Sequence, residues 1–412
     1  MTHRKKLILK AATGLLVTGA TLTLSAMVYG LPPRGMPVGK AVVSPKAVSN
    51  KILVRFQPGI TAMEVAHAQG TIKIKSQQNI RSVDGLKTVT LPPGQDLASA
   101  IAQYKNNPNV LYVEPDYEMT PSAAPNDASF GNLWGLNNTG QTLGGTTGTV
   151  DADMNVLEAW TNTGVTGSNS VVIAVIDTGV QYDHPDLVAN MWANPGETLN
   201  NGIDDDGNGY IDDIYGINAI TGSGNPMDDD SHGTHVAGTI AAVGNNATGT
   251  TGVVQQAKIL ACKFIPAVGG GATSDAIKCL DYIYALKQKG INIIVSSNSW
   301  GGTGSSQALA DAIDAQRRAG ILFVAAAGND SQDNDATPHY PANYFKPNII
   351  TVAATTQMDT LASFSDFGLR TVHVGAPGTN IYSTTPGNTY GYKQGTSMAA
   401  PHVAGLVALV LP

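Results

Sequence analysis

The 412-residue sequence has few charged residues and no excess of basic ones. Asp, Glu, Lys and Arg make up 13% of the chain, against about 25% in an average soluble domain. The formal net charge is −7, and because the basic residues form no stripe, we expect no nucleic acid partner. The 46 glycines indicate a surface built mostly from Gly, Ser, Thr and Asn. The length leaves room for more than one domain.

Beyond its first 30 residues the sequence lacks any apolar run long enough to span a membrane. Those first residues follow the secretory signal pattern: a basic start at His3–Lys6, an apolar run over Ala11–Val28, and a small residue at Gly30. A retained single anchor is the alternative, because a spanning helix needs about 20 apolar residues. We expect residues 1–30 to be a signal peptide. The mature protein is then secreted, extracellular or periplasmic, with no membrane attachment after processing.

Only two cysteines are present. Cys262 lies in the apolar run "KILACKFI", and Cys279 lies in the helix-like "SDAIKCLDYIYALKQKG". An exported chain can keep a disulfide between them. Two buried apolar thiols fit the sequence equally well.

After a linker at 31–49, residues 50–119 predict a small α+β domain of ferredoxin-like type. The strand-like runs are "KILVRF", "TIKIK", "GLKTVTL" and "NVLYVEP", and the helix-like runs are "TAMEVAHAQ" and "DLASAIAQYKNN". Their order is the split βαβ pattern, βαββαβ. The unit holds no pair of nucleophile and base, so alone it indicates a binding or folding module. Residues 120–127, "TPSAAPND", are typical of an exposed, cleavable linker.

Residues 128–412 predict a larger α/β domain with a doubly wound, mostly parallel sheet. Apolar runs such as "SVVIAVID", "INIIVSSNSWG" and "ILFVAAAGN" alternate with helical stretches. Strands without polar alternation are buried on both faces, which is typical of a parallel sheet covered by helices. Functional residues gather at the carboxyl ends of such strands. Asp177, Ser299 and Asn329 stand at or just after three of these runs.

Four residues together could carry acyl transfer. Ser397 could be the nucleophile, His232 the base that takes its proton, and Asp177 the group that orients the imidazole. Asn329 could donate its side-chain amide to an oxyanion. Taken singly, each residue could be only a cap or turn residue, but the four fill every role that such a site needs.

The motifs around these residues carry a resemblance to a known family. "VIDTGV", "HGTHVAG" and "GTSMAAPHVAG" resemble the three signatures of the subtilases, the subtilisin-like serine peptidases, in the same order Asp, His, Ser. The resemblance covers about residues 128–412. It implies a serine endopeptidase that hydrolyses proteins or peptides, made as a zymogen, with residues 50–119 as its own inhibitory propeptide. It also implies that the backbone N–H of Ser397, at a helix start, faces the oxyanion.

Two other functions remain open at this point. The same scaffold could be a catalytically inactive secreted binding protein, or residues 50–119 could act as an inhibitor of other proteases. The family also continues past the serine helix with further strands and a helix, whereas this sequence ends 15 residues after Ser397. We therefore expect a C-terminally incomplete domain that leaves Leu406, Val407, Leu409 and Val410 with too few packing partners.

The resemblance further implies two segments that bind substrate. One lines the pocket for the residue before the scissile bond and pairs with an extended peptide by main-chain hydrogen bonds; its residues are Ser299, Trp300 and Gly301. The other is an opposing strand at Gly269, Gly270 and Gly271. A merely flexible loop is the alternative for the glycines. Main-chain pairing predicts broad specificity.

The stretch "NNGIDDDGNGYIDD" predicts a structural Ca²⁺ site. Its residues match the first nine positions of an EF-hand loop, with hard oxygen ligands at alternate places: Asp204, Asp206, Asn208, the carbonyl of Tyr210, and Asp212. Tyr215 stands where the bidentate Glu of that loop would be. The alternative is a surface turn rich in Asp and Asn.

The family resemblance implies a second Ca²⁺ site. Its ligands would be the side chains of Asp186 and Asn246 with the carbonyls of Thr248 and Thr250.

Overall fold

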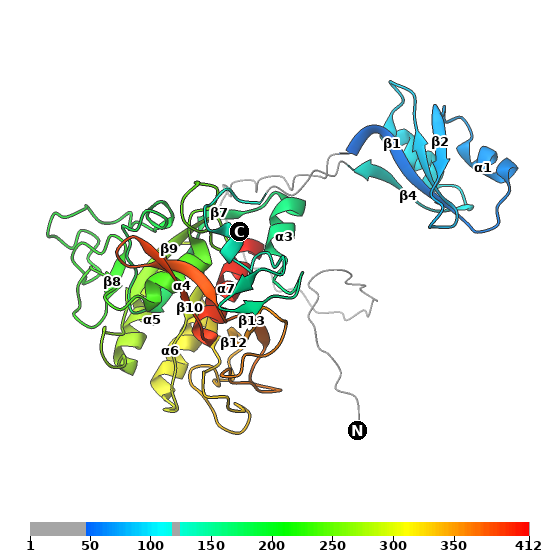
Figure 1. The fold of residues 1–412 in the computed structure, drawn as a ribbon. Coiled ribbons are helices and arrows are strands. Elements are labelled where there is room, and N and C mark those ends of the chain that lie inside the picture. Colours follow the sequence, from blue (N-terminus) through cyan, green and yellow to red (C-terminus); the bar gives the residue numbers. More distant parts are fainter. Residues whose placement is uncertain (1–46, 118–123, 412) are drawn as a thin grey trace, which may run out of the picture. The chain divides into compact units, whose positions relative to one another are not determined.

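The structure is a computed structural model that describes residues 47–117 and 124–411. The expected signal peptide, nearly all of the linker at 31–49 and the first part of the linker at 120–127 lie outside the described residues. Within the described ranges, no helix combines the length and apolarity needed to cross a bilayer. Each of the two described ranges contains its own β-sheet (Figure 1).

Residues 47–117 form a four-stranded antiparallel sheet with two helices. The elements are β1 (Ala47–Phe56), α1 (Ala62–Gln69), β2 (Ser76–Asn79), β3 (Leu86–Thr90), α2 (Leu97–Lys105) and β4 (Val110–Tyr117). Thr61 and Glu64 form a capping box at the start of α1, and Asp96 caps α2, as the sequence favours. The strand order β2-β3-β1-β4 is that of a ferredoxin-like domain, as predicted.

The third predicted element of this domain is wrong in its position. The sequence places a strand at residues 71–75, but the ladder with β3 begins at Ser76. Ile72 is buried in the domain core and Ile74 packs against it, so the alternation of "TIKIK" reflects burial rather than strand pairing. The strand that does pair with β3 has only exposed side chains, which is why its sequence gave no signal.

Residues 124–411 form the larger domain around a seven-stranded sheet. Its strands are β7 (Gly167–Asp177), β8 (Gly216–Asn218), β9 (Gln256–Lys263), β10 (Ile293–Asn298), β11 (Leu322–Ala326), β12 (Ile349–Thr355) and β13 (Val374–Pro377). The order is β13-β12-β11-β10-β7-β9-β8, and every one of these neighbouring pairs is parallel.

The remaining elements cover the sheet and its ends. The helices are α3 (Val156–Thr163), α4 (His232–Ala241), α5 (Thr273–Gln288), α6 (Gln307–Arg318) and α7 (Thr396–Val410), with short 3₁₀ turns η1 (Phe130–Asn132) and η2 (Val188–Asn190). Two hairpins complete the set: β5 (Thr142–Leu143) with β6 (Thr146–Thr147), and β14 (Ile381–Thr385) with β15 (Thr389–Lys393).

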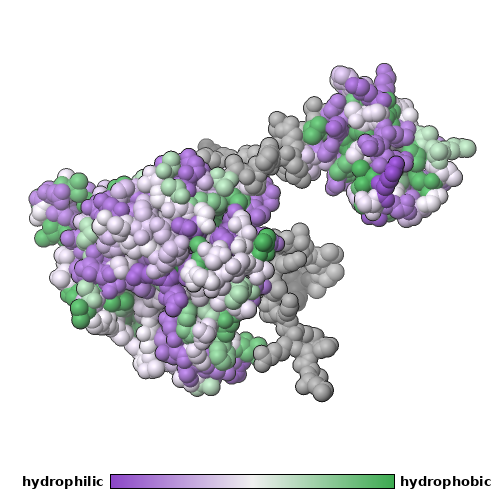
Figure 2. Space-filling model, in the orientation of Figure 1, coloured by the Kyte–Doolittle hydropathy of each residue, from purple (hydrophilic) through white to green (hydrophobic). Residues whose placement is uncertain are grey.

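Helices cover both faces of the large sheet, which confirms the predicted doubly wound fold. Successive side chains of a strand point to opposite faces. Val171, Ile173 and Val175 of β7 join one core with α3, α4 and α7. Val172, Ala174 and Ile176 join a second core with α5 and α6. On the outside, hydrophobic residues are scattered among hydrophilic ones over the face drawn in Figure 2.

The path of the chain determines where the functional residues gather. From β7 the chain builds β8 and β9 on one side of the sheet and then returns to place β10 on the other side of β7. The loops that leave β7 and β10 therefore run apart, and ligands of open α/β sheets bind at such a point. Asp177 ends β7 and Ser299 follows β10.

Cys262 and Cys279 form a disulfide. The bond ties β9 to α5 within the second core. It decides between the two interpretations that the sequence left open.

The last helix is more buried than the sequence analysis predicted. Leu409 is only 8% exposed, Leu406 and Val407 pack against the core, and Val410 is 65% exposed. The prediction of an uncovered apolar face is wrong for Leu409, because α7 packs across β10–β13 and against α4. Gly405 permits this close approach, since a Cβ there would lie 2.6 Å from the Cβ of Val253.

Candidate active site

Asp177 and His232 are brought together where β7 ends and α4 begins. The Nδ1 of His232 lies 2.7 Å from Oδ1 of Asp177, which is fully buried. Because an ionised carboxylate only accepts hydrogen bonds, the proton of this bond belongs to Nδ1. The Nε2 of His232 is then the proton acceptor. Gly233 makes the approach possible, since a Cβ at that position would overlap the carbonyl oxygen of Gly179.

The surroundings of His232 favour the protonated form of its imidazole. Burial alone would lower the pKa of the imidazole, but the charge and the hydrogen bond of Asp177 outweigh burial and raise it above its ordinary value. The His232 side chain keeps 25% of its surface exposed, so the ring remains accessible to a reactant.

Ser397 lies in the first turn of α7, next to Ser299. Its hydroxyl donates to the carbonyl oxygen of Ser299 at 3.1 Å, and the Ser299 hydroxyl donates to the carbonyl oxygen of Ser397 at 2.8 Å. Among the described contacts the Ser397 hydroxyl is therefore directed to Ser299 rather than to His232. Hydrogen bonds between nucleophile and base often form fully only when substrate is bound.

Asn329 follows β11 and holds the start of α7. Its Oδ1 accepts hydrogen bonds from the backbone N–H of Thr396 at 2.8 Å and from the Thr396 hydroxyl at 3.1 Å. A Cβ placed on Gly395 would lie 3.5 Å from the backbone nitrogen of Ser397 and 3.8 Å from Nδ2 of Asn329. The Oδ1 of Asn329 would lie 3.6 Å from the same Cβ, so the backbone nitrogen of Ser397 and the side-chain amide of Asn329 both border one corner beside Gly395.

The predicted substrate segments lie on either side of Phe264. Ser299, Trp300 and Gly301 directly follow β10, and the Trp300 ring meets the Phe264 ring at 4.9 Å between centroids. A Cβ on Gly271 would lie 2.6 Å from the same ring. The structure thus places the two segments beside one aromatic side chain.

Gly269, Gly270 and Gly271 do not form the predicted strand. They lie in an exposed loop between β9 and α5, and Gly269 has a φ of +93°. This left-handed conformation breaks the extended path of a strand. The three glycines therefore lie in a loop, and their part in binding substrate stays a prediction.

The acidic loop after β7 holds a cluster of carboxylates, but not with all the predicted residues. Oxygens of Glu197, Asp206 and Asp213 lie within 4.8 Å of one another. Asp204 instead accepts the backbone N–H groups of Asn208 and Gly209.

Asp212, predicted at the ninth ligand position, turns away from the cluster. With a φ of +51°, its carboxylate accepts the backbone N–H groups of Asn201 and Gly202 at 3.1 and 3.0 Å. Its neighbour Asp213 points inward instead and is fully buried.

Asn208 and Tyr210 stay in the loop beside the cluster. The Nδ2 of Asn208 donates to Asp213 at 2.9 Å, and the backbone N–H of Tyr210 donates to Oδ1 of Asn208 at 2.8 Å.

This cluster fits a divalent cation. Burial raises the pKa of Asp213 to about 6, although hydrogen bonds from Tyr282, Asn208 and Asn194 oppose the change. Oε2 of Glu197 is buried without a hydrogen-bond partner among the described residues. A buried carboxylate oxygen without a partner is costly, and a hard cation with oxygen ligands removes that cost. The sequence offered no signal for Glu197.

The residues of the second predicted cation site also lie together. The buried carboxylate of Asp186 accepts Nδ2 of Asn246 at 2.7 Å and the backbone N–H of Thr250 at 2.8 Å. Oδ1 of Asn246 accepts the backbone N–H of Thr248 at 2.8 Å.

Asp127 adds a carboxylate to this second site that the sequence analysis missed. It is 4% exposed and accepts the backbone N–H groups of Asn245 and Asn246 at 2.9 and 3.3 Å. Burial and the charge of Asp127 raise the pKa of Asp186 above its ordinary value, although its hydrogen bonds oppose the shift. Two buried carboxylates side by side fit a cation. Asp127 escaped notice because it lies at the end of the predicted linker.

His235 has a packing role. Its Nε2 lies 3.0 Å from the carbonyl oxygen of Ile381 and 3.1 Å from that of Gly391, and burial lowers its pKa to about 3. It therefore joins α4 to the β14–β15 hairpin as a neutral ring.

Comparison with known proteins follows the same division of the chain. The profile described as "Subtilase family" matches residues 168–412, and the profile described as "Fervidolysin N-terminal prodomain" matches residues 37–116.

Two named relatives illustrate the similarity. "Subtilisin-like protease 1" of Plasmodium falciparum (isolate 3D7) is 40% identical over 260 residues, which are 58% of this chain and 37% of that protein. This chain thus matches little more than a third of that relative's length. "Extracellular protease" of Xanthomonas campestris pv. campestris is 33% identical over 439 residues, covering 98% of this chain and 72% of that protein.

A solved structure is also similar. It is described as "Crystal structure of a cold adapted subtilisin-like serine proteinase". It has a TM-score of 0.50 and 30% sequence identity, and the match covers 68% of this chain and 84% of that one.

Proposed function

The chain belongs to the subtilase family, and from that premise we propose that it is a secreted serine endopeptidase, made as a zymogen and stabilised by Ca²⁺. The observation that carries the proposal is the pairing of His232 with the buried Asp177 at 2.7 Å. The same domain offers a serine at a helix start with two N–H donors beside it. Together these groups supply a base, its orienting carboxylate, a nucleophile and an oxyanion site.

In the proposed reaction, the Ser397 hydroxyl turns from the carbonyl of Ser299 to Nε2 of His232. The imidazole takes the proton as Ser397 attacks the substrate carbonyl, and Asp177 stabilises the resulting imidazolium. The raised pKa of His232 suits it to hold that proton and then give it to the leaving amine. The backbone N–H of Ser397 and Nδ2 of Asn329 donate to the oxyanion.

The proposed substrates are proteins or peptides bound in extended form. The backbone of Ser299–Gly301 lies beside Ser397 and could pair with the peptide main chain. Trp300 and Phe264 would form the apolar floor of that segment.

Residues 47–117 would act as the chain's own propeptide. Their antiparallel sheet and two helices coincide with the region that matches a prodomain profile. Export is supported by the signal-like start of the sequence and by the disulfide, which suits an oxidising compartment.

The proposed Ca²⁺ ions have a structural part. One would be held by Glu197, Asp206 and Asp213. The other would be held by Asp127, Asp186 and Asn246, with carbonyls of Thr248 and Thr250. A bound Ca²⁺ would neutralise buried carboxylates that otherwise repel each other.

The test is hydrolysis of casein by the full chain and by Ser397→Ala. We expect the matured wild-type protein to degrade casein and the alanine variant, with an unchanged circular dichroism spectrum, to be inactive. Equal turnover by both proteins would remove Ser397 from the mechanism. A folded wild-type protein that binds casein without cutting it would instead favour a binding function.

A further inference from the structure

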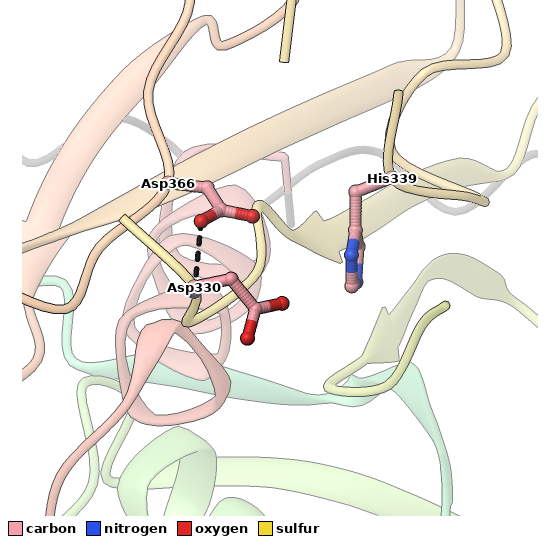
Figure 3. Close-up of side chains that lie close together, drawn as sticks. All are labelled: Asp330, His339 and Asp366. Atoms are coloured by element: carbon pink, nitrogen blue, oxygen red, sulfur yellow. Dashed lines mark hydrogen bonds between the residues drawn. The ribbon is translucent and has the colours of Figure 1, made fainter. Parts of the chain in front are cut away.

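Asp330, His339 and Asp366 form an acidic cluster beyond Asn329. One ligand atom from each residue lies within 4.8 Å of the other two, and Figure 3 shows the two carboxylates on one side of a gap and the imidazole on the other. Asp366 is 1% exposed, whereas Asp330 is exposed. None of the three belongs to the catalytic set described above.

The cluster lies against both segments that would hold the substrate residue before the scissile bond. A Cβ on Gly301 would overlap Nε2 of His339, and the backbones of Gly302 and Tyr340 exchange hydrogen bonds of 2.8 and 2.7 Å. On the other side, a Cβ on Gly328 would overlap Oδ2 of Asp366. Since β10 and β11 are parallel neighbours, the segments that follow them lie side by side.

A peptide paired with Ser299–Gly301 would direct one side chain toward this cluster. Its reacting carbonyl must lie between Ser397 and Asn329. The side chain of the residue that owns that carbonyl then enters between the segment 299–302 and the segment 328–330. The glycines at 301, 302 and 328 contribute no side chain that would block the path.

The charge of the cluster is not balanced by the protein. Oδ1 of Asp366 accepts the backbone N–H groups of Asp330 at 2.8 Å and Gln332 at 2.9 Å, which fixes this carboxylate. In the described part of the chain, neither Asp330 nor Asp366 forms a salt bridge with Lys or Arg. Burial lowers the pKa of His339 despite the opposing charges of Asp366 and Asp330, so the ring adds no positive charge at neutral pH.

We propose that Asp330 and Asp366 give this endopeptidase a preference for Lys or Arg before the scissile bond. The inference rests on the proposed function and refines the broad specificity expected from main-chain pairing alone. A long cationic side chain reaches past the glycines and supplies the positive charge that the two carboxylates lack. A charge-assisted hydrogen bond to the buried Asp366 is the stronger of the two contacts, because water screens it less.

The experiment measures kcat/KM of the matured full chain for fluorogenic peptides that differ only before the scissile bond. Lysine is compared with norleucine, a neutral side chain of similar length, and with glutamate. We expect lysine to exceed norleucine by about 10-fold or more, as one charge-assisted hydrogen bond allows, and glutamate to be the poorest.

Two variants assign the effect to the cluster. Asp330→Asn should reduce the lysine-to-norleucine ratio several-fold while leaving kcat/KM for norleucine unchanged. Asp366→Asn should reduce the ratio further. Because Asp366 also holds the turn at 330–332, norleucine turnover serves as the internal check on general damage. Asp311→Asn, an exposed carboxylate on α6, is the matched control and should change nothing.

Three results would overturn the inference. A lysine-to-norleucine ratio near one, with clear turnover of both peptides, contradicts the preference but leaves the proposed function intact. A ratio near one in Ca²⁺ buffer, with one bound ion lost in Asp366→Asn, would make the cluster a metal site instead. Absence of turnover for every peptide would overturn the proposed function as well, and the casein assay would show the same failure.

Discussion

Asn329 has two separate tasks in the proposed site. Its Oδ1 accepts two hydrogen bonds from Thr396, which fixes the residue directly before Ser397. Its amide nitrogen is the proposed oxyanion donor. An alanine at position 329 would remove both contributions, so it cannot separate positioning from donation. An aspartate would keep the acceptor but would replace the donor with a negative charge that repels the oxyanion.

We therefore expect Asn329→Ala to lower kcat by about 10²–10³ with little change in KM, the loss typical of one missing oxyanion donor, and Asn329→Asp to lower kcat at least as much. The measurement is steady-state hydrolysis of a lysine peptide, with melting temperature as the control for folding. Turnover close to wild type in Asn329→Asp would rule out the amide as a donor.

The structure brings Asp177 and His232 together as the sequence predicts, whereas it gathers a different set of carboxylates at the first cation site. The apolar pattern and the three motifs located Asp177 at a strand end, Asn329 after a strand, and His232 and Ser397 at helix starts, and the structure has these elements there. The choice between Asp212 and Asp213 depends on one backbone angle, the positive φ of Asp212. Glu197 and Asp127 approach their sites through tertiary contacts, and spacing along the chain carries no information about such contacts.

The acidic loop between β7 and β8 holds the carboxylates of the first proposed Ca²⁺ site. Glu197 enters through Oε1, which accepts the backbone N–H of Asp206 at 3.0 Å, while its Oε2 is buried without a described partner. Lys289 reaches Asp206 at 3.1 Å, but its charge lies at one edge of the cluster. A Ca²⁺ among the three carboxylates would join the loop to the fully buried Asp213.

Chelation of Ca²⁺ should lower the melting temperature by about 5 °C or more, since an ion at 100 times its dissociation constant stabilises the fold by about 2.7 kcal/mol. Differential scanning calorimetry with and without chelator measures the shift. Glu197→Gln keeps an acceptor for Asp206 and should make the shift smaller. Asp311→Asn, which changes an exposed carboxylate on α6 outside both sites, should leave it unchanged. A melting temperature indifferent to chelator would reject both cation sites.

Secondary structure was predictable where burial and strand pairing coincide. Strands such as β7 and β11 are apolar on both faces because helices cover both, so their sequences are continuous apolar runs. In and before β2, burial and strand pairing fall on different residues. The buried Ile72 precedes the strand, and the paired residues are exposed and polar. The glycines at 269–271 show a different error. The family resemblance implied a strand there, but the structure has a loop.

The order of the domains along the chain supports the proposed zymogen. A small domain at residues 47–117 precedes the larger domain, and the sequence between them is small and polar. The end of the predicted linker belongs to the larger domain, because Pro125 and Asp127 are buried and Asn126 accepts the backbone N–H of Ala247 at 2.9 Å. Cleavage that preserves these contacts must therefore fall before Pro125.

One measurement tests the central claim, that Ser397 makes this chain a self-processing serine endopeptidase. It is the intact mass and N-terminal sequence of the wild-type chain and of Ser397→Ala, both expressed in full. We expect the wild-type protein to lose its N-terminal domain and to begin between Pro121 and Pro125. The alanine variant should keep residues 50–119 attached. Identical processing of the two proteins, or a wild-type start inside residues 50–117, would contradict the account.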